Sequence, residues 1–74
     1  MFRVSVESTT LASISYDAGE RMLELEFTSM SVYRYRDVPA ALHAELLTAP
    51  SKGRFFNQRI RGLFSHERAE AAAR

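Results

Sequence analysis

The stretch MLELEFTSMSVYRYR, Met22 to Arg36, decides the fold. Its first half alternates apolar residues with glutamates, and its second half alternates tyrosines with arginines. Side chains that alternate with a period of two point to opposite faces of a β-strand. The small polar run between the two halves predicts a turn. The stretch therefore predicts a β-hairpin with one apolar and aromatic face and one charged face.

The register of this hairpin follows from requiring favourable cross-strand pairs of side chains on both faces. We expect a three-residue loop, residues 29–31. It would place apolar and aromatic side chains opposite each other in the pairs Phe27–Tyr33 and Leu25–Tyr35. It would place acids opposite arginines in the pairs Glu26–Arg34 and Glu24–Arg36. A shift of one residue would instead set the tyrosines against glutamates, so both arginines are expected to have acidic partners within the domain.

The rest of the chain predicts further strands and then two helices. Residues 2–7 and 11–17 alternate with the strand period. Residues 39–49 favour a helix that ends before Pro50, and Ser51 is a good N-cap for a second helix, roughly Lys52 to Arg61. The predicted fold class is α+β: an antiparallel meander of three to four strands with two C-terminal helices packed on one face.

The domain is expected to cover residues 1–64, with residues 65–74 as a frayed or helical tail, because that tail has little but alanine to bury. The predicted core collects the apolar and aromatic residues that share the inner faces of these elements. They are Val4, Val6, Ile14, Tyr16, Leu23, Leu25, Phe27, Tyr33, Tyr35, Leu42, Leu46, Phe56, Ile60 and Leu63.

Composition excludes several classes of function. A chain of 74 residues makes one small domain with little interior to spare for a deep cleft. It has no cysteine, so disulfides, thiolate metal sites and cysteine nucleophiles are excluded. No apolar run is long enough to cross a bilayer, and no secretory signal is visible. We expect a cytoplasmic protein that does not engage membranes.

No residue pattern predicts catalysis or metal binding. The two histidines, His43 and His66, are 23 residues apart and lack further ligands at metal-binding spacing. Glu24 and Glu26 share a strand face, but arginines are available to pair with them. No nucleophile stands with a base, and no glycine-rich phosphate loop is present. We predict that the protein is not an enzyme and uses no metal or cofactor.

The charge distribution points to a binding surface. No acid occurs from Leu46 to His66, whereas four cations do, and such a span favours nucleic-acid binding. On a helical wheel the apolar side chains of this span face the core, and Arg54 and Arg61 lie on the opposite side. The candidate nucleic-acid contacts are Lys52, Arg54, Phe55, Asn57, Arg59 and Arg61, with Phe55 and Arg59 as a stacked pair at the boundary.

Tyr33 and Tyr35 share a strand face and allow two interpretations. They either pack in the core with their hydroxyls at its rim or form a platform on which bases stack. The register above favours the core.

Several short motifs resemble the KTSC domain, a small domain named for the C-terminus of some bacterial lysyl-tRNA synthetases. The matching segments are ISYD (14–17), LELEF (23–27), VYRY (32–35) followed by Val38-Pro39, SKGRFFN (51–57) and IR (60–61). Ser15 and the turn at residues 29–31 depart from the family, which often has glycine there. The resemblance implies a bacterial or phage protein of the cytoplasm without a cofactor, and it suggests RNA binding.

Two functions follow from these observations. The first is a small RNA-binding or nucleic-acid-binding module that uses the basic second helix to hold tRNA or single-stranded RNA. The second is a protein-interaction module, including a homodimer formed through a sheet edge or the free sheet face.

Overall fold

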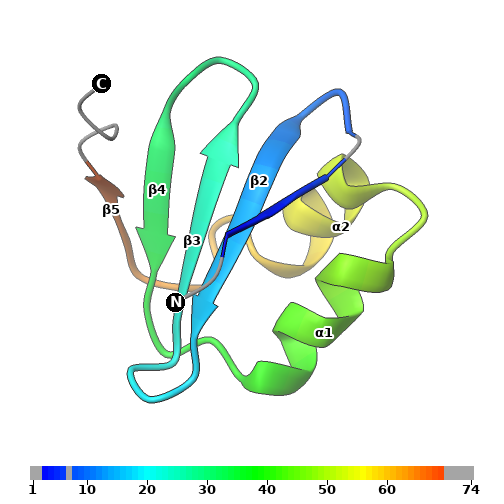
Figure 1. Ribbon diagram of the computed structural model, residues 1–74. Helices are drawn as coiled ribbons and strands as arrows, with labels where there is room; N and C mark the ends of the chain where they lie inside the picture. The colour runs from blue at the N-terminus through cyan, green and yellow to red at the C-terminus, as the bar shows by residue number, and fades with distance from the viewer. Residues whose placement is uncertain (1–2, 7, 70–74) are drawn as a thin grey trace.

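The computed structural model describes residues 3–6 and 8–69. Its elements in chain order are β1 (Arg3–Ser5), β2 (Leu11–Asp17), β3 (Met22–Phe27), β4 (Val32–Tyr35), α1 (Ala40–Thr48), α2 (Lys52–Arg59) and β5 (His66–Ala69). The strands form one antiparallel sheet in the order β1-β2-β3-β4-β5, and both helices cover the same face of it (Figure 1). The predicted α+β class is confirmed, as is the meander with two helices on one face.

The fifth strand was not predicted. Residues 66–69 return from the helices and pair with β4, with Tyr35 opposite His66 and Val32 opposite Ala69. The prediction of a frayed or helical tail is wrong for these four residues, and residues 70–74 lie outside the described part of the chain. Local sequence favours helix here, but the strand gains pairing with β4 and buries Ala69, and such tertiary contacts override propensity.

The β3–β4 hairpin keeps the predicted faces with a different register. Leu25 lies opposite Tyr33, so the pairing is shifted by two residues and every side chain stays on its expected face. The loop has three residues but begins one position earlier than predicted, because the Phe27 N–H donates to the Ser31 carbonyl at 2.8 Å. Met30 takes a positive φ of 78°, a conformation that glycine usually supplies in such loops.

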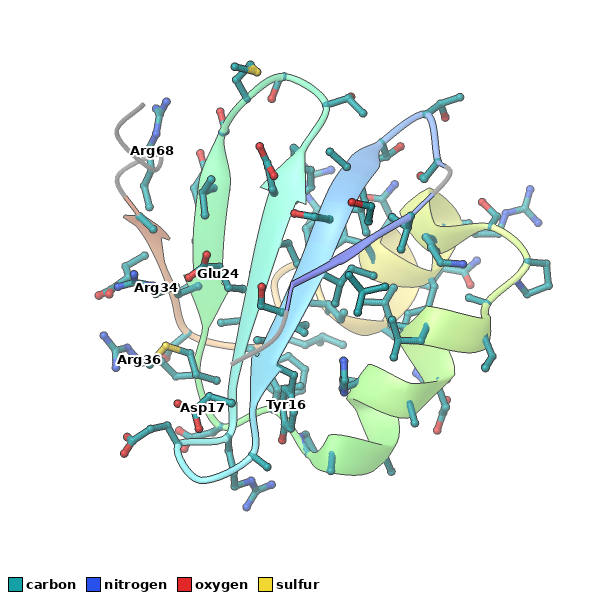
Figure 2. The ribbon with its side chains drawn as sticks, viewed as in Figure 1. Tyr16, Asp17, Glu24, Arg34, Arg36 and Arg68 are labelled. Atoms are coloured by element: carbon teal, nitrogen blue, oxygen red, sulfur yellow. The ribbon has the colours of Figure 1, made fainter. Side chains whose placement is uncertain are left out.

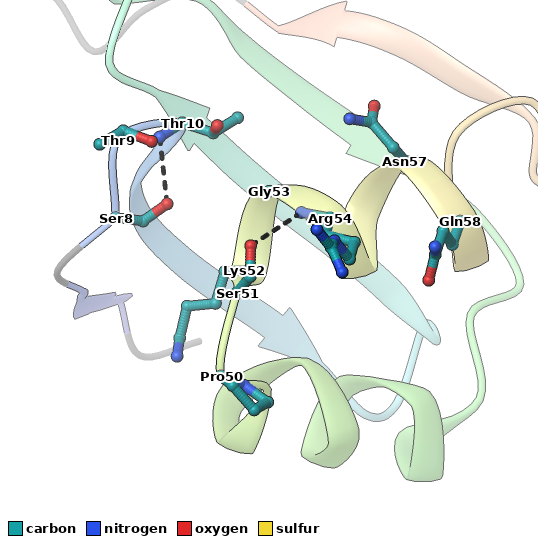
Figure 3. Close-up of a pocket in the computed structure, with 10 residues that line it drawn as sticks. All are labelled: Ser8, Thr9, Thr10, Pro50, Ser51, Lys52, Gly53, Arg54, Asn57 and Gln58. Atoms are coloured by element: carbon teal, nitrogen blue, oxygen red, sulfur yellow. Dashed lines mark hydrogen bonds between the residues drawn. The ribbon is translucent and has the colours of Figure 1, made fainter.

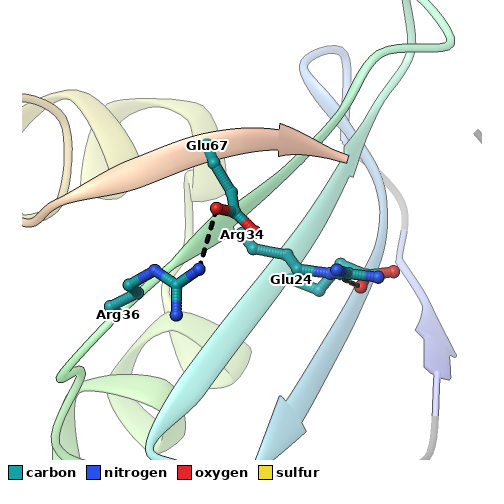
Figure 4. A network of polar contacts seen from close by, with 4 residues as sticks. All are labelled: Glu24, Arg34, Arg36 and Glu67. Carbon is teal, nitrogen blue, oxygen red and sulfur yellow. Dashed lines mark hydrogen bonds and ion pairs between the residues drawn. The ribbon is translucent and has the colours of Figure 1, made fainter. Parts of the chain in front are cut away.

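The register shift changes which charges pair. Arg34 Nε lies 3.0 Å from Glu24 Oε1, and Arg36 Nη2 lies 2.8 Å from Glu67 Oε1 (Figure 4). The predicted pairs Glu26–Arg34 and Glu24–Arg36 are therefore wrong. The expectation that both arginines have acidic partners within the domain is confirmed, although one partner comes from the unpredicted strand β5.

The core lies between the sheet and the two helices. Ten buried residues form it: Leu11, Ile14, Leu23, Leu25, Tyr35, Val38, Leu42, Leu46, Phe56 and Ile60. Val4 and Leu63 were predicted to be buried but are 46% and 66% exposed. Val4 lies on an edge strand, and Leu63 follows the end of α2, where Gly62 turns the chain with a φ of 77°.

The other face of the sheet is polar but not bare. Ser13, Ser15 and Glu24 are buried there, and the Ser13 hydroxyl donates to Glu26 Oε1 at 2.9 Å. Figure 2 shows Arg34 on the same side as Glu24. This face therefore pairs its own charges and hydroxyls. No helix among the described residues is long and apolar enough to span a membrane.

Candidate nucleic-acid interface

The first turn of α2 packs closely on the loop between β1 and β2. Ser51 caps the helix, with its hydroxyl accepting from the Arg54 N–H at 3.3 Å. At Gly53, a Cβ atom would lie only 2.6 Å from Thr10 Oγ1. A side chain at this position would therefore push the helix away from the loop. On the loop itself, the Ser8 hydroxyl accepts from the backbone N–H of Thr10 at 3.0 Å and fixes its shape.

A groove of about 540 Å³ lies between these two segments (Figure 3). We call it the α2 groove. It is lined by residues 8–10, residues 50–54, Asn57 and Gln58. Its walls offer hydroxyls, side-chain amides, a lysine and an arginine, and no acidic residue lines it within the described part of the chain. The groove therefore presents hydrogen-bond donors and acceptors together with positive charge.

Three of the six predicted contact residues, Lys52, Arg54 and Asn57, line the α2 groove. Lys52 Nζ donates to the Ala49 carbonyl at 3.1 Å, so the lysine also closes the end of α1. The Arg54 side chain is exposed and has no ion pair or side-chain hydrogen bond among the described residues. Arg54 is thus the cation of the groove that is available to a ligand.

Phe55 and Arg59 lie elsewhere on α2. The Arg59 guanidinium carbon is 5.2 Å from the centre of the Phe55 ring, so the predicted stacked pair is present. Arg59 Nη1 also lies 3.2 Å from Glu45 Oε1 of α1. Glu45 partly neutralises this arginine, and neither member of the stacked pair lines the α2 groove.

Arg61 is separated from Arg54 because α2 ends earlier than predicted. The last helical residue is Arg59, and Ile60 has a φ of −124°. The wheel that placed Arg54 and Arg61 on one side therefore does not reach Arg61. Arg61 Nη1 donates to Asn57 Oδ1 at 3.4 Å, and the arginine lines a second cavity.

This second cavity, which we call the aromatic cavity, has a volume of about 420 Å³. Its lining combines five rings with polar residues of two loops: Phe27, Tyr33, Tyr35, Phe56 and His66, with Ser29, Ser31, Arg61 and Gly62. The sequence did not predict this cavity, because its wall includes His66 of the unpredicted strand. No sequence pattern connected His66 to the tyrosines.

Tyr35 shows which interpretation of the tyrosines holds. Its ring is 4% exposed and belongs to the core, while Tyr33 is half-buried against it. Burial raises the pKa of Tyr35 to about 12, the nearby Tyr33 adds to the rise, and the positive charge of Arg61 opposes it. The preferred interpretation, packing in the core with the hydroxyls at its rim, fits both residues.

Across residues 3–6 and 8–69, no three histidine, cysteine, aspartate or glutamate side chains gather into a group that could hold a metal ion. The ion pairs between described residues include Arg34–Glu24, Arg36–Glu67 and Arg59–Glu45.

Comparison with known proteins identifies the family. A family model of the KTSC domain matches residues 7–64. An uncharacterized protein from Stutzerimonas stutzeri is 47% identical over 58 residues, which cover 78% of this chain and 82% of that protein. A lysine–tRNA ligase from Nostoc punctiforme is 41% identical over 61 residues, which cover 82% of this chain but only 11% of the ligase.

The fold agrees with a solved structure. A crystal structure of a KTSC domain protein from Yersinia pestis matches with a TM-score of 0.91 and 39% identity, covering 93% of this chain and 97% of that one. The sequence match and the structural match thus indicate the same family over nearly the whole chain. The protein belongs to the KTSC domain family.

Proposed function

We propose that this KTSC domain is a non-enzymatic RNA-binding module whose α2 groove contacts the phosphate backbone of single-stranded RNA or tRNA. The observation that carries the proposal is the composition of the groove. It gathers an unpaired arginine, hydroxyls and amides around the start of a helix, and none of the described residues that line it is acidic.

The donors of the groove suit phosphate. Arginine, serine, threonine and asparagine side chains and helix N-termini are the usual contacts to phosphate oxygens. The first backbone N–H groups of α2, at Lys52 and Gly53, have no carbonyl one turn earlier within the helix. They lie beside Arg54 at the same end of the groove. A phosphate in this place would receive both charge and hydrogen bonds.

The relatives support RNA as the polyanion. The matching segment of the lysine–tRNA ligase is 11% of an enzyme whose name states that it acts on tRNA. Additional contacts to the same nucleic acid would give a small domain attached to such an enzyme a function.

The proposal is tested by NMR titration of the labelled protein with bulk tRNA and with mixed-sequence single-stranded RNA at two salt concentrations. We expect shifts at Ser51, Lys52, Arg54 and Asn57 that decrease steeply as salt rises. Arg54→Gln should weaken binding. Arg21→Gln, at the far end of β2 from the groove, removes the same charge and should not. A spectrum that neither RNA changes at low salt would contradict the proposal.

The alternative, a protein-interaction module or homodimer, has less support. The open sheet face pairs its own polar groups, as Glu24 and Arg34 show. The edge strands have three and four residues, and β5 carries exposed charges at Glu67 and Arg68, which discourage strand addition. Under this account sedimentation gives a monomer mass at every concentration, and a mass that rises with concentration would favour the alternative.

A further inference from the structure

We infer that the aromatic cavity receives one unpaired base of the bound RNA, while Arg61 holds the phosphate beside that base. The inference rests on the proposed function, because it places a second contact on the same RNA. It adds a base-binding site to a surface otherwise built for the backbone.

The walls of the cavity suit a flat aromatic ligand. The ring centres of Tyr35 and Phe56 are 5.8 Å apart, and those of Phe27 and Phe56 are 5.2 Å apart, both edge to face. Tyr35 and Phe56 are buried, and Phe27 is partly buried. Tyr33 and His66 also line the cavity, with their ring centres 5.8 Å apart. A cavity of 420 Å³ lies at the small end of ligand pockets and suits one base rather than a folded partner.

The cavity also offers polar groups to the edge of a base. Tyr35 is buried, yet its hydroxyl makes no hydrogen bond to any described residue. No buried polar side-chain atom of the described residues lacks a partner, so this hydroxyl touches solvent-accessible space, and Tyr35 lines the cavity. Ser29 and Ser31 of the β3–β4 loop line the same cavity. Bases of single strands are read by such hydrogen bonds together with stacking.

Charge favours the same ligand. Arg61 lines the cavity and has no ion pair among the described residues. No acid lines the cavity among residues 3–6 and 8–69, and Glu67, the acid next to His66, pairs with Arg36 on the other face of the sheet. An apolar ligand alone would not need this arginine, whereas a nucleotide brings the phosphate that matches it.

A direct contact connects the cavity to the α2 groove. Asn57 lines the groove, and its Oδ1 accepts from Arg61, which lines the cavity. The groove and the cavity are therefore joined by a path from Arg54 through Asn57 to Arg61, which lies just beyond the end of α2. A strand whose backbone follows this path brings a base to the mouth of the cavity.

The experiment compares two oligonucleotides of eight nucleotides by NMR titration. One is mixed-sequence single-stranded RNA, and the other has the same backbone without bases. Both should shift Arg54 and Asn57, because both carry the same phosphates. Only the RNA with bases should shift Tyr33 and His66, because only it has a ring to place in the cavity.

Each outcome separates the two proposals. Shifts in the groove with both ligands, and none in the cavity, would overturn this inference and leave the proposed function standing. Shifts at Tyr33 and His66 with the base-free ligand would also overturn it, because the rings of the cavity would then respond to phosphate alone. No shift anywhere would remove the proposed function and the inference together.

Variants give a second readout that does not depend on assigning shifts. His66→Ala changes an exposed residue and should weaken binding of the RNA with bases by about 5-fold, the lower range for loss of a stacking ring. The same variant should leave binding of the base-free oligonucleotide unchanged. Tyr33→Phe keeps the ring and serves as the matched control for Tyr33→Leu. Equal loss for both oligonucleotides in His66→Ala would contradict the inference.

Discussion

The two helices cover the same face of the sheet but differ in what they contribute. Helix α1 sends Leu42 and Leu46 into the core and stacks His43 on Tyr16, with ring centres 4.6 Å apart. Its first turn has no acid and its last turn no base. Helix α2 buries one residue, Phe56, along its length and turns cations and amides to solvent.

This difference separates stability from binding. A domain of this size depends on a small core, so the buried residues of α1 cannot be truncated without a loss of stability. The outer side of α2 contributes little burial, so its charges are open to use by a ligand. Changes in α1 should therefore lower the free energy of unfolding, whereas changes on the outer side of α2 should alter binding alone.

The largest effect is expected from Leu46→Ala in α1. Leu46 is completely buried, and its truncation should lower the free energy of unfolding by about 2–5 kcal/mol. Leu63→Ala, at a position 66% exposed, is the matched control and should change it by less than about 0.5 kcal/mol. Urea unfolding followed by circular dichroism measures both, and similar values for the two variants would contradict this description of the core.

Gly53→Ala tests the close packing of α2 on the β1–β2 loop. The new Cβ would meet Thr10 Oγ1 at 2.6 Å and Thr10 Cβ at 3.1 Å. Overpacking of this kind should cost about 1–3 kcal/mol of the free energy of unfolding, although alanine favours helix more than glycine does. In a Thr10→Ala background the cost should decrease. An equal cost in both backgrounds would show that this contact is not the cause.

Ser51→Ala tests the helix cap. Loss of the hydroxyl that accepts from the Arg54 N–H should lower the free energy of unfolding by about 1 kcal/mol. Ser51→Asp keeps an acceptor and should preserve stability. It also places an acid in the groove and should weaken RNA binding, which separates the two roles of this end of α2. A stable protein with undiminished RNA affinity after Ser51→Asp would argue against the groove.

The smallest effect concerns pH and returns to α1. Burial lowers the pKa of His43. The unfolded chain, with a histidine pKa of about 6.5, therefore takes up its proton first as the pH falls. The contribution of neutral, buried His43 to stability is complete above the pKa of the unfolded chain. It should be lost as the pH falls from there through the lower pKa that His43 has in the folded protein. Urea unfolding at pH 7.5 and 5.5 should show this decline, and His43→Gln should reduce it. Identical declines in both proteins would contradict the assignment.

Sequence patterns predicted the faces of the elements better than their partners. The period of two assigned Leu25 and Tyr33 to the inner face correctly, because a shift of two residues preserves faces. It did not predict the register, since that depends on Met30 taking a left-handed conformation without a glycine to signal it. It also missed β5, whose stability comes from pairing with β4 and not from the strand propensity of its own residues.

The candidate site was predicted only in part, because local patterns show neither where a helix ends nor which loop lies beside it. A helical wheel identified Arg54 and Asn57 as outward-facing and Phe56 as buried. It failed for Arg61, because the helix ends at Arg59 and the chain then turns. The loop residues that complete the groove, such as Ser8, are more than 40 positions away from α2 in the sequence. No local pattern could have joined them to it.

The central claim is that the α2 groove contacts RNA phosphates through Arg54. The most direct test measures the affinity for a labelled eight-nucleotide single-stranded RNA by fluorescence anisotropy over a series of salt concentrations. For each phosphate neutralised, the logarithm of the binding constant should fall by about 0.7 per tenfold rise in salt. The account predicts clear binding at low salt and a slope for Arg54→Gln that is shallower by about 0.7 than that of the unaltered protein, with Arg21→Gln unchanged. Absence of binding at low salt, or equal slopes for all three proteins, would contradict it.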